Sequence, residues 1–209
     1  MSTDRDERLA ARSAGGPVPG VPLLNIANIL TIARIVVVPI FLAALFVGDG
    51  HDPGWRIVAG ALFALAAVTD RVDGQLARRY GLVTDFGKLA DPIADKALIG
   101  AALIGLSVLG DLSWWVTVVI VIREVGVTLL RFAVLRHGVI PAGRGGKLKT
   151  LVQTVAVGLY VLPLSGVSHQ FAAAAMGVAV GLTVVTGLDY VVQAARLRMA
   201  PLPVAPQSR

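Results

Sequence analysis

The sequence predicts an all-α integral membrane protein with six transmembrane helices, and three observations support this fold class. Of its 209 residues, 56% are hydrophobic and 15% are charged, whereas a soluble domain carries roughly a quarter charged residues. The apolar residues form blocks of about 20 residues, which is the length of helix that crosses a bilayer. The basic residues also gather in alternate connections between these blocks, as in membrane proteins with a fixed orientation.

Six apolar blocks, separated by glycine, proline and charged residues, mark the predicted helices. They cover residues 23–47, 57–79, 86–109, 114–136, 148–164 and 171–195. We expect one six-helix transmembrane domain over residues 21–198 and a short tail over 199–209. The polar start, residues 1–20, has no apolar segment typical of a signal peptide, which predicts a cytosolic arm.

The distribution of charge predicts the orientation of the helices. The connections "GDGHDPG", "GDLS" and "SGVSHQ" contain no Lys or Arg. The basic residues of the other side are Arg5, Arg8, Arg12, Arg78, Arg79, Lys88, Arg136, Arg144, Lys147, Lys149, Arg196 and Arg198. By the positive-inside rule, both termini are cytosolic in a multi-pass protein of the plasma membrane. The net charge of +6 therefore indicates topology and contact with anionic lipid headgroups, and no nucleic-acid partner is expected.

A few residues are expected at the outer face. Trp55, Trp114 and Trp115 resemble the aromatic belt at a membrane interface. Asp111 is predicted to cap a helix or a loop there, and the histidines are predicted to be surface residues because no metal-ligand spacing relates them. The chain has no cysteine, which excludes disulfides, thiolate metal sites and thiol nucleophiles.

One stretch of the chain concentrates carboxylates. The segment "DRVDGQLARRYGLVTDFGKLADPIADK", residues 70–96, holds five of the thirteen acidic residues. Asp70 and Asp73 are three residues apart, and Asp91 and Asp95 are four apart, so each pair shares one face of a helix. A helical hairpin can bring the two pairs together, within roughly 15 Å of the cytosolic surface.

Four ionised carboxylates at that depth need cations, because desolvation and mutual repulsion both oppose their charges. A site with only carboxylate oxygens suits Mg²⁺ or Mn²⁺ and does not suit zinc or copper. Four carboxylates can hold two ions, the arrangement that clamps both oxygens of a phosphoryl displacement. A purely structural role would leave these aspartates without a purpose, and intramembrane acids are mostly functional.

Small residues and an arginine accompany these acids. Gly74 and Gly87 leave the backbone accessible beside the two acidic faces, and Ala77 continues the small surface. Arg78 provides a fork of N–H donors that suits a phosphate. The alternative is that the small residues serve only to let two helices pack closely.

The full pattern, D-x-x-D-G-x-x-A-R-x8-G-x3-D-x3-D, resembles the signature of the CDP-alcohol phosphotransferases. Its positions here are Asp70, Asp73, Gly74, Ala77, Arg78, Gly87, Asp91 and Asp95. Further segments, "NIANILTIARIVVVPIFL", "ADPIADK", "IREVGVTLLR" and "GGKLKT", are similar to those of the bacterial phosphatidylglycerophosphate synthases. The resemblance implies the six-helix fold of that family, an active site facing the cytosol and a homodimer.

The resemblance also implies an activity. Those enzymes transfer a phosphatidyl group from CDP-diacylglycerol to sn-glycerol 3-phosphate and release CMP. Asp70, Asp73, Asp91 and Asp95 would hold two Mg²⁺ or Mn²⁺ ions, and Asp95 would also be the general base. The residues that would bind CDP-diacylglycerol are Asn28, Thr31, Gly74, Ala77, Arg78, Thr84 and Gly87.

The phosphate of the acceptor needs a separate cationic site. Arg123 and Arg131, both on the fourth predicted helix, and Lys147 and Lys149, at the start of the fifth, are the candidates. The lysines could instead only set the topology. Arg123 could instead form a structural ion pair with Glu124 or Asp85.

Two kinds of alternative remain. The same chemistry could use another acceptor, such as inositol phosphate, serine or a second phosphatidylglycerol, which would give cardiolipin. Membrane aspartates also mark cation transporters. A transporter would place them near the midplane in two repeated halves, and this chain has one cluster and no visible repeat.

Overall fold

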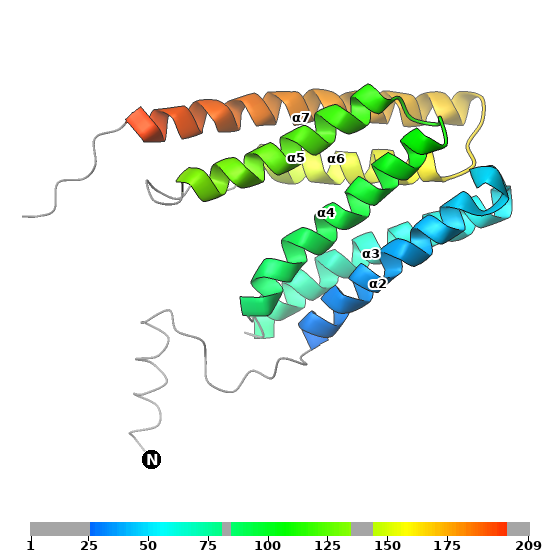
Figure 1. The fold of residues 1–209 in the computed structure, drawn as a ribbon, viewed down its shortest axis with the longest axis horizontal. Coiled ribbons are helices and arrows are strands. Elements are labelled where there is room, and N and C mark those ends of the chain that lie inside the picture. The colour runs from blue at the N-terminus through cyan, green and yellow to red at the C-terminus, as the bar shows by residue number, and fades with distance from the viewer. Residues whose placement is uncertain (1–25, 81–84, 135–143, 200–209) are drawn as a thin grey trace, which may run out of the picture.

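The computed structural model describes residues 26–80, 85–134 and 144–199, and in these residues the fold is all-α (Figure 1). Six α-helices and one short 3₁₀ turn follow one another along the chain. They are α2 (Ile26–Phe46), η1 (Val47–Gly50), α3 (Pro53–Tyr80), α4 (Asp85–Val108), α5 (Trp114–Val134), α6 (Arg144–Val161) and α7 (Val167–Met199). The six predicted helical blocks are therefore confirmed as helices. The predicted arm, residues 1–20, and residues 200–209 of the tail lie outside the described residues.

The helix boundaries differ from the sequence prediction where capping chemistry decides them. α3 begins at Pro53, before the predicted start at residue 57. The Asp52 carboxylate accepts a hydrogen bond of 2.9 Å from the backbone N–H of Trp55, so Asp52 caps the helix and Pro53 occupies its first turn. α6 begins at Arg144 instead of residue 148, and its first turns carry the glycines that the prediction treated as a connection.

The helices form two groups of three, α2–α4 and α5–α7 (Figure 1). Within the groups, α2 packs on α3 and α4, and α7 packs on α5 and α6. α4 and α3 connect the groups through contacts of α4 with α5 and α6, and of α3 with α6. The groups meet where η1 and the α4–α5 and α6–α7 connections lie, and they diverge toward the opposite end (Figure 1).

The hydrophobic core lies between the two groups. It includes Phe41 of α2, Phe63 of α3, Leu103 of α4, Ile120 of α5 and Val157 of α6, all at most 2% exposed. The rings of Phe41 and Phe63 lie 5.9 Å apart in a tilted arrangement, a favourable geometry for an aromatic pair. This core holds together the parts of the helices that lead to the diverging end.

The outer surface of the bundle is apolar as well. Leu65, Ile122, Leu129, Val185 and Phe171 are each more than 60% exposed, which is unusual for water-facing positions and normal for lipid-facing ones. In the described part of the chain, two stretches are long and apolar enough to cross a bilayer, Ile32–Gly50 and Val167–Ala195. The shorter apolar stretches are Pro53–Thr69, Lys96–Val108 and Leu148–Val161.

α3 and α4 each carry half of the acidic motif. Asp70 and Asp73 follow the apolar residues of α3, and Asp91 and Asp95 precede those of α4. Both helices thus combine an apolar half with a half rich in charge. The prediction of six spans remains a prediction, whereas the membrane character of the fold is supported by its apolar surface.

Gly50 allows a close contact in the turn between α2 and α3. Gly50 has a φ of +75°, which L side chains rarely adopt, and a Cβ there would lie 2.3 Å from the Cδ2 of Leu109. The backbone of η1 therefore approaches the end of α4 closely. This contact joins two of the three connections at the compact end of the bundle.

Candidate active site

The signature residues lie on two helices that are consecutive in the chain. Asp70, Asp73, Gly74, Ala77 and Arg78 are in the last turns of α3. Gly87, Asp91 and Asp95 are in the first turns of α4. The predicted helical spacing of the acidic pairs is thus confirmed at the level of the backbone.

The two acidic segments lie at the same, diverging end of the bundle (Figure 1). The described side chains of α3 end at Thr69 and those of α4 begin at Lys96. The aspartate side chains, Arg78 and the side chains of Asn28 and Thr31 on α2 lie outside that part, and Thr84 lies outside the described residues. The grouping of these side chains into one site remains a prediction.

The metal site is likewise a prediction. Among the described side chains, no group of three His, Asp or Glu residues could hold a metal ion. The side chains of the four motif aspartates are not among the described ones. Their donor set, carboxylate oxygens repeated at helical spacing on two neighbouring helices, fits Mg²⁺ or Mn²⁺.

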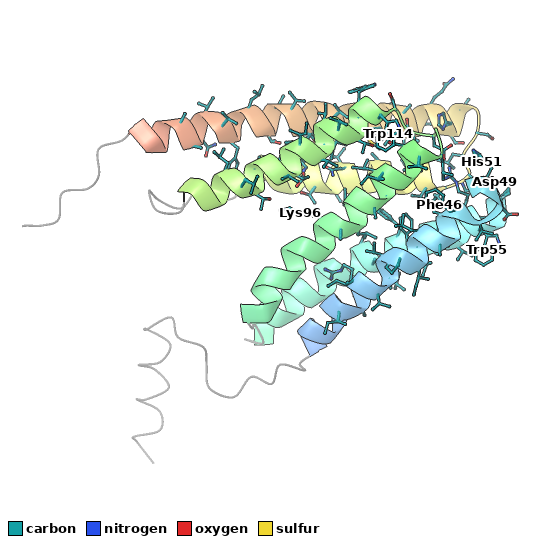
Figure 2. The ribbon with its side chains drawn as sticks, viewed as in Figure 1. Phe46, Asp49, His51, Trp55, Lys96 and Trp114 are labelled. Carbon is teal, nitrogen blue, oxygen red and sulfur yellow. The ribbon has the colours of Figure 1, made fainter. Side chains whose placement is uncertain are left out.

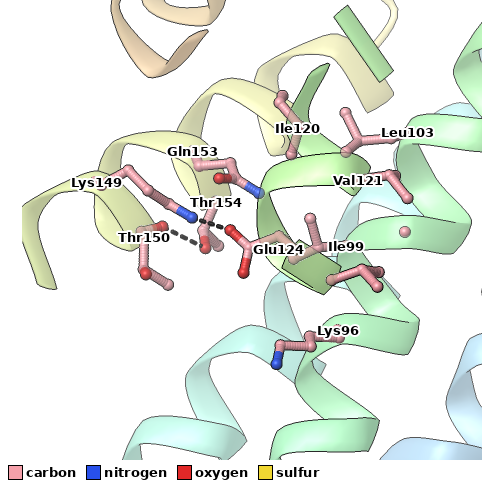
Figure 3. A pocket seen from close by; sticks show the side chains of 12 residues that line it. Lys96, Ile99, Leu103, Ile120, Val121, Glu124, Lys149, Thr150, Gln153 and Thr154 are labelled. Carbon is pink, nitrogen blue, oxygen red and sulfur yellow. Dashed lines mark hydrogen bonds and ion pairs between the residues drawn. The ribbon is translucent and has the colours of Figure 1, made fainter. Parts of the chain in front are cut away.

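A mostly apolar cavity with a polar edge lies next to the acidic segment, between α4, α5 and α6 (Figure 3). Its volume is about 100 Å³. Its wall contains apolar residues such as Ile99 and Leu103 together with a polar set. The polar lining residues are Lys96, Glu124, Lys149, Thr150, Gln153 and Thr154.

The cavity comes within one helical turn of Asp95. Lys96, the next residue of α4, lines it, and Ile99, Gly100 and Leu103 continue the same wall. One residue of an α-helix rises by about 1.5 Å, so the backbone of Lys96 lies at nearly the level of the predicted general base. Lys96 lies well away from the end that carries His51, Asp49 and Trp55 (Figure 2).

Two cations of different helices meet at one carboxylate in this region. The Lys149 ammonium of α6 forms an ion pair with Oε1 of Glu124 on α5. Nη1 of Arg123 donates to the same oxygen over 3.2 Å. The Lys149 side chain is only 2% exposed, so it is part of the interior and not a surface charge that only sets the topology.

The remaining polar contacts fix Arg123 and Lys96. Nη2 of Arg123 donates over 3.0 Å to the hydroxyl of Thr186 on α7. The Lys96 ammonium donates to the hydroxyl of Thr128 on α5. That hydroxyl in turn donates over 2.7 Å to the carbonyl of Glu124. The cations near the cavity are therefore oriented by side chains of two helices, α5 and α7.

The structure describes the side chains of two of the four predicted acceptor residues. Lys149 lines the cavity, and Arg123 is bonded to its wall residue Glu124. The ion pair of Arg123 with Glu124, which we considered as an alternative to phosphate binding, is present. Arg131 is on α5 and Lys147 on α6, and their side chains lie outside the described set.

The sequence analysis missed Lys96 as a lining residue and treated Glu124 only as an ion-pair partner. A signal for the cavity was available in the sequence. Lys149, Thr150, Gln153 and Thr154 form a polar stripe at helical spacing on the otherwise apolar helix α6. Such a stripe predicts a face turned toward a polar interior.

At the opposite end of the bundle the structure corrects the role of Asp111. We expected Asp111 to cap a helix or loop, but its carboxylate accepts a hydrogen bond of 2.6 Å from Nη2 of Arg56. Nε2 of His51 lies 3.8 Å from the same carboxylate. The exposed Trp55, Trp114 and Trp115 belong to elements of this end, and Trp55 and Trp114 are visible there in Figure 2.

Comparison with known proteins gives the family. The CDP-alcohol phosphatidyltransferase family model matches residues 24–185. A probable phosphatidylglycerophosphate synthase of Mycobacterium tuberculosis is 59% identical over 196 residues, which cover 93% of this chain and 94% of the relative. The CDP-diacylglycerol–glycerol-3-phosphate 3-phosphatidyltransferase of Bacillus subtilis is 41% identical over 181 residues, covering 80% and 94%.

A third relative has a different printed activity. The cardiolipin synthase (CMP-forming) of Streptomyces coelicolor is 33% identical over 185 residues, which cover 84% of this chain and 85% of the relative. The matched region contains all eight signature positions and the cavity between α4, α5 and α6. This chain is therefore a member of the CDP-alcohol phosphatidyltransferase family.

Proposed function

We propose that this protein transfers a phosphatidyl group from CDP-diacylglycerol to sn-glycerol 3-phosphate, giving phosphatidylglycerophosphate and CMP in phospholipid biosynthesis. The observation that carries the proposal is the 59% identity, over nearly the whole of both chains, to a probable phosphatidylglycerophosphate synthase. The Bacillus subtilis relative, named for the same acceptor, supports it. The complete signature on α3 and α4 supplies the chemical groups that the reaction requires.

The signature residues would bind different parts of CDP-diacylglycerol. Asp70, Asp73, Asp91 and Asp95 would hold two Mg²⁺ or Mn²⁺ ions, which neutralise the pyrophosphate charge when bound. The nucleotide would lie against the small residues Gly74, Ala77 and Gly87, and Arg78 would donate to phosphate oxygens. Asn28, Thr31 and Thr84 would add polar contacts.

Asp95 would act as the general base. Its carboxylate takes the proton from the primary hydroxyl of the acceptor as that oxygen attacks the phosphorus that bears diacylglycerol. The bond from this phosphorus to the CMP oxygen breaks, and CMP leaves with the electron pair. Because little covalent chemistry is asked of the protein, the positions of the two substrates decide most of the rate.

The acceptor would bind in the cavity between α4, α5 and α6. The support for this assignment is its position within one turn of Asp95 and its two lining lysines, Lys96 and Lys149. A phosphate monoester requires cationic donors of this kind. Arg123, Arg131 and Lys147 would complete the positive surroundings of the phosphate.

The membrane arrangement is part of the same proposal. Six spans, cytosolic termini and an active site facing the cytosol of the plasma membrane agree with the basic residues on one side and the tryptophans on the other. The apolar exterior of the helices supports contact with the bilayer. A homodimer is expected from the resemblance to the family.

The test is release of CMP from CDP-diacylglycerol by the purified protein in detergent with Mg²⁺ or Mn²⁺. Glycerol 3-phosphate, inositol phosphate, serine and phosphatidylglycerol are supplied one at a time. We expect release with glycerol 3-phosphate, and a kcat about 10²- to 10⁴-fold lower in Asp95→Asn. Release only with phosphatidylglycerol would instead indicate the activity named for the Streptomyces relative.

No release with any acceptor from folded protein would overturn the enzymatic proposal and return attention to cation transport. A matched control for the aspartate variant is Asp189→Asn. Asp189 accepts a hydrogen bond of 2.7 Å from Gln193 on the exposed side of α7, outside the proposed site. Its variant should retain the wild-type rate.

A further inference from the structure

We propose that Glu124 is a positioning residue for the acceptor site, and that its carboxylate holds the Lys149 ammonium and the Arg123 guanidinium where they bind the phosphate of the acceptor. The inference rests on the proposed function, because it concerns the same cavity. It adds a residue to which no role in catalysis or binding has been given above. Glu124 acts through the two cations and not on the reacting atoms.

The contacts converge on a single atom. Oε1 of Glu124 accepts from Nζ of Lys149 and, over 3.2 Å, from Nη1 of Arg123. These two cations come from α6 and α5, and Glu124 is the residue that joins them. Figure 3 shows the Lys149 side of this contact. A change in the position of this carboxylate therefore moves both cations.

Burial makes the contact with this carboxylate important for Lys149. The Lys149 side chain is 2% exposed, whereas that of Glu124 is 23% exposed. An ammonium ion out of contact with water is costly unless a carboxylate compensates its charge. Glu124 thus stabilises a charged lysine in the wall of the cavity, where a lysine can bind a phosphate.

Arg123 is confined from two sides. Glu124 binds Nη1, and Thr186 of α7 accepts from Nη2. Gly187 of α7 lies against the same side chain, since a Cβ there would be 3.1 Å from Cγ of Arg123. Glu124 and α7 therefore position the guanidinium together.

The charge balance explains why a carboxylate belongs in a site for an anion. Lys96 and Lys149 line the cavity, Arg123 adjoins its wall through Glu124, and Glu124 offsets one of these three positive charges. With Arg131 and Lys147, which the proposed function also places around the phosphate, the site keeps a net positive charge. Such a charge favours an acceptor that carries a phosphate.

The experiment compares Glu124→Gln, Glu124→Asp, Lys149→Met and the double variant Glu124→Gln/Lys149→Met, with Asp189→Asn as the matched control. CMP release gives the KM for glycerol 3-phosphate, the KM for CDP-diacylglycerol and kcat. Thermal unfolding in detergent is followed for each variant. The double variant removes both charges of the buried pair, so it remains informative if Glu124→Gln alone fails to fold.

We expect Glu124→Gln to raise the KM for glycerol 3-phosphate about tenfold, which corresponds to about 1.4 kcal/mol. The KM for CDP-diacylglycerol should stay within about twofold of the wild type, because its proposed site is on α3 and the start of α4. Glu124→Asp should recover part of the loss. The double variant should raise the acceptor KM by less than the product of the two single effects, because both changes remove the Lys149–Glu124 interaction, and its loss beyond that of Lys149→Met measures the effect on Arg123.

Equal increases of both KM values, or effects of Glu124→Gln and Lys149→Met that multiply in the double variant, would overturn the positioning role. Failure of the proposed function would give a different result. The wild type would then release CMP with another acceptor, and both KM values of Glu124→Gln would be measured with that acceptor. A raised KM for that acceptor with an unchanged KM for CDP-diacylglycerol would support the positioning role of Glu124, even though the acceptor assignment had failed.

Discussion

The Arg56 guanidinium of α3 donates a hydrogen bond of 2.6 Å to the Asp111 carboxylate in the α4–α5 connection. The Arg56 side chain is 8% exposed and that of Asp111 is 21% exposed. Nη2 of Arg56 also reaches the carbonyl of Tyr160 on α6 at 3.4 Å. One buried guanidinium thus ties together three elements at the compact end of the bundle, opposite the acidic motif.

This relationship predicts a stability effect without a catalytic one. Asp111→Asn leaves a buried guanidinium without its counter-charge, which typically costs about 3 to 5 kcal/mol. We expect a clearly lower thermal unfolding temperature in detergent and an unchanged KM for both substrates below that temperature. The double variant Arg56→Met/Asp111→Leu should regain much of the stability. Unfolding of Asp111→Asn at the wild-type temperature would show that the pair contributes little.

Lys96 is predicted to contribute to acceptor binding. Lys96→Met removes one of the two lysines that line the cavity, and a lost charge-assisted hydrogen bond predicts an increase of about tenfold or more in the KM for glycerol 3-phosphate. Thr128→Val is the matched control, because it removes the hydroxyl that Lys96 contacts and keeps the ammonium. Its effect should be clearly smaller. Equal effects would mean that Lys96 acts only through its contact with α5.

Two glycines of α7 form a pair for a second binding test. A Cβ at Gly187 would lie 3.1 Å from Cγ of Arg123, whereas a Cβ at Gly181 has no neighbour within 4 Å. We expect Gly187→Ala to displace Arg123 and raise the acceptor KM a few-fold, with CDP-diacylglycerol unaffected. Gly181→Ala should leave both KM values unchanged and raise stability slightly, by up to about 1 kcal/mol. An unchanged acceptor KM in Gly187→Ala would show that Arg123 does not contribute to acceptor binding.

Removal of divalent ions is predicted to abolish the reaction. Carboxylates alone cannot neutralise the pyrophosphate of CDP-diacylglycerol, so a chelator should stop CMP release, and added Mg²⁺ or Mn²⁺ should restore it. Asp91→Asn should need a higher ion concentration for half-maximal rate, because one ligand is lost. Full activity in the presence of excess chelator would contradict the two-ion site.

Much of the fold could be predicted from the sequence, because helix formation in a membrane depends on local composition. The six apolar blocks correspond to α2–α7, and the spacing of Asp70 with Asp73 and of Asp91 with Asp95 falls on continuous helices. The errors concern helix starts. α3 starts earlier than predicted because Asp52 caps it, and α6 starts earlier because its first turn includes the glycines after Arg144. A count of apolar residues does not detect either feature.

The sequence by itself determined the family, since the eight signature positions and their spacing are properties of the chain, and it determined which residues could bind metal and phosphate. Only the tertiary structure decided which charges meet. Lys149 with Glu124 and Arg56 with Asp111 are pairs between separate elements, and helical periodicity relates only residues within about four positions of each other. The same holds for Lys96, whose place in the cavity depends on how α4 packs against α5 and α6. Long-range packing chooses these partners because a charge inside an apolar bundle is stable only beside an opposite charge or a hydrogen-bond partner.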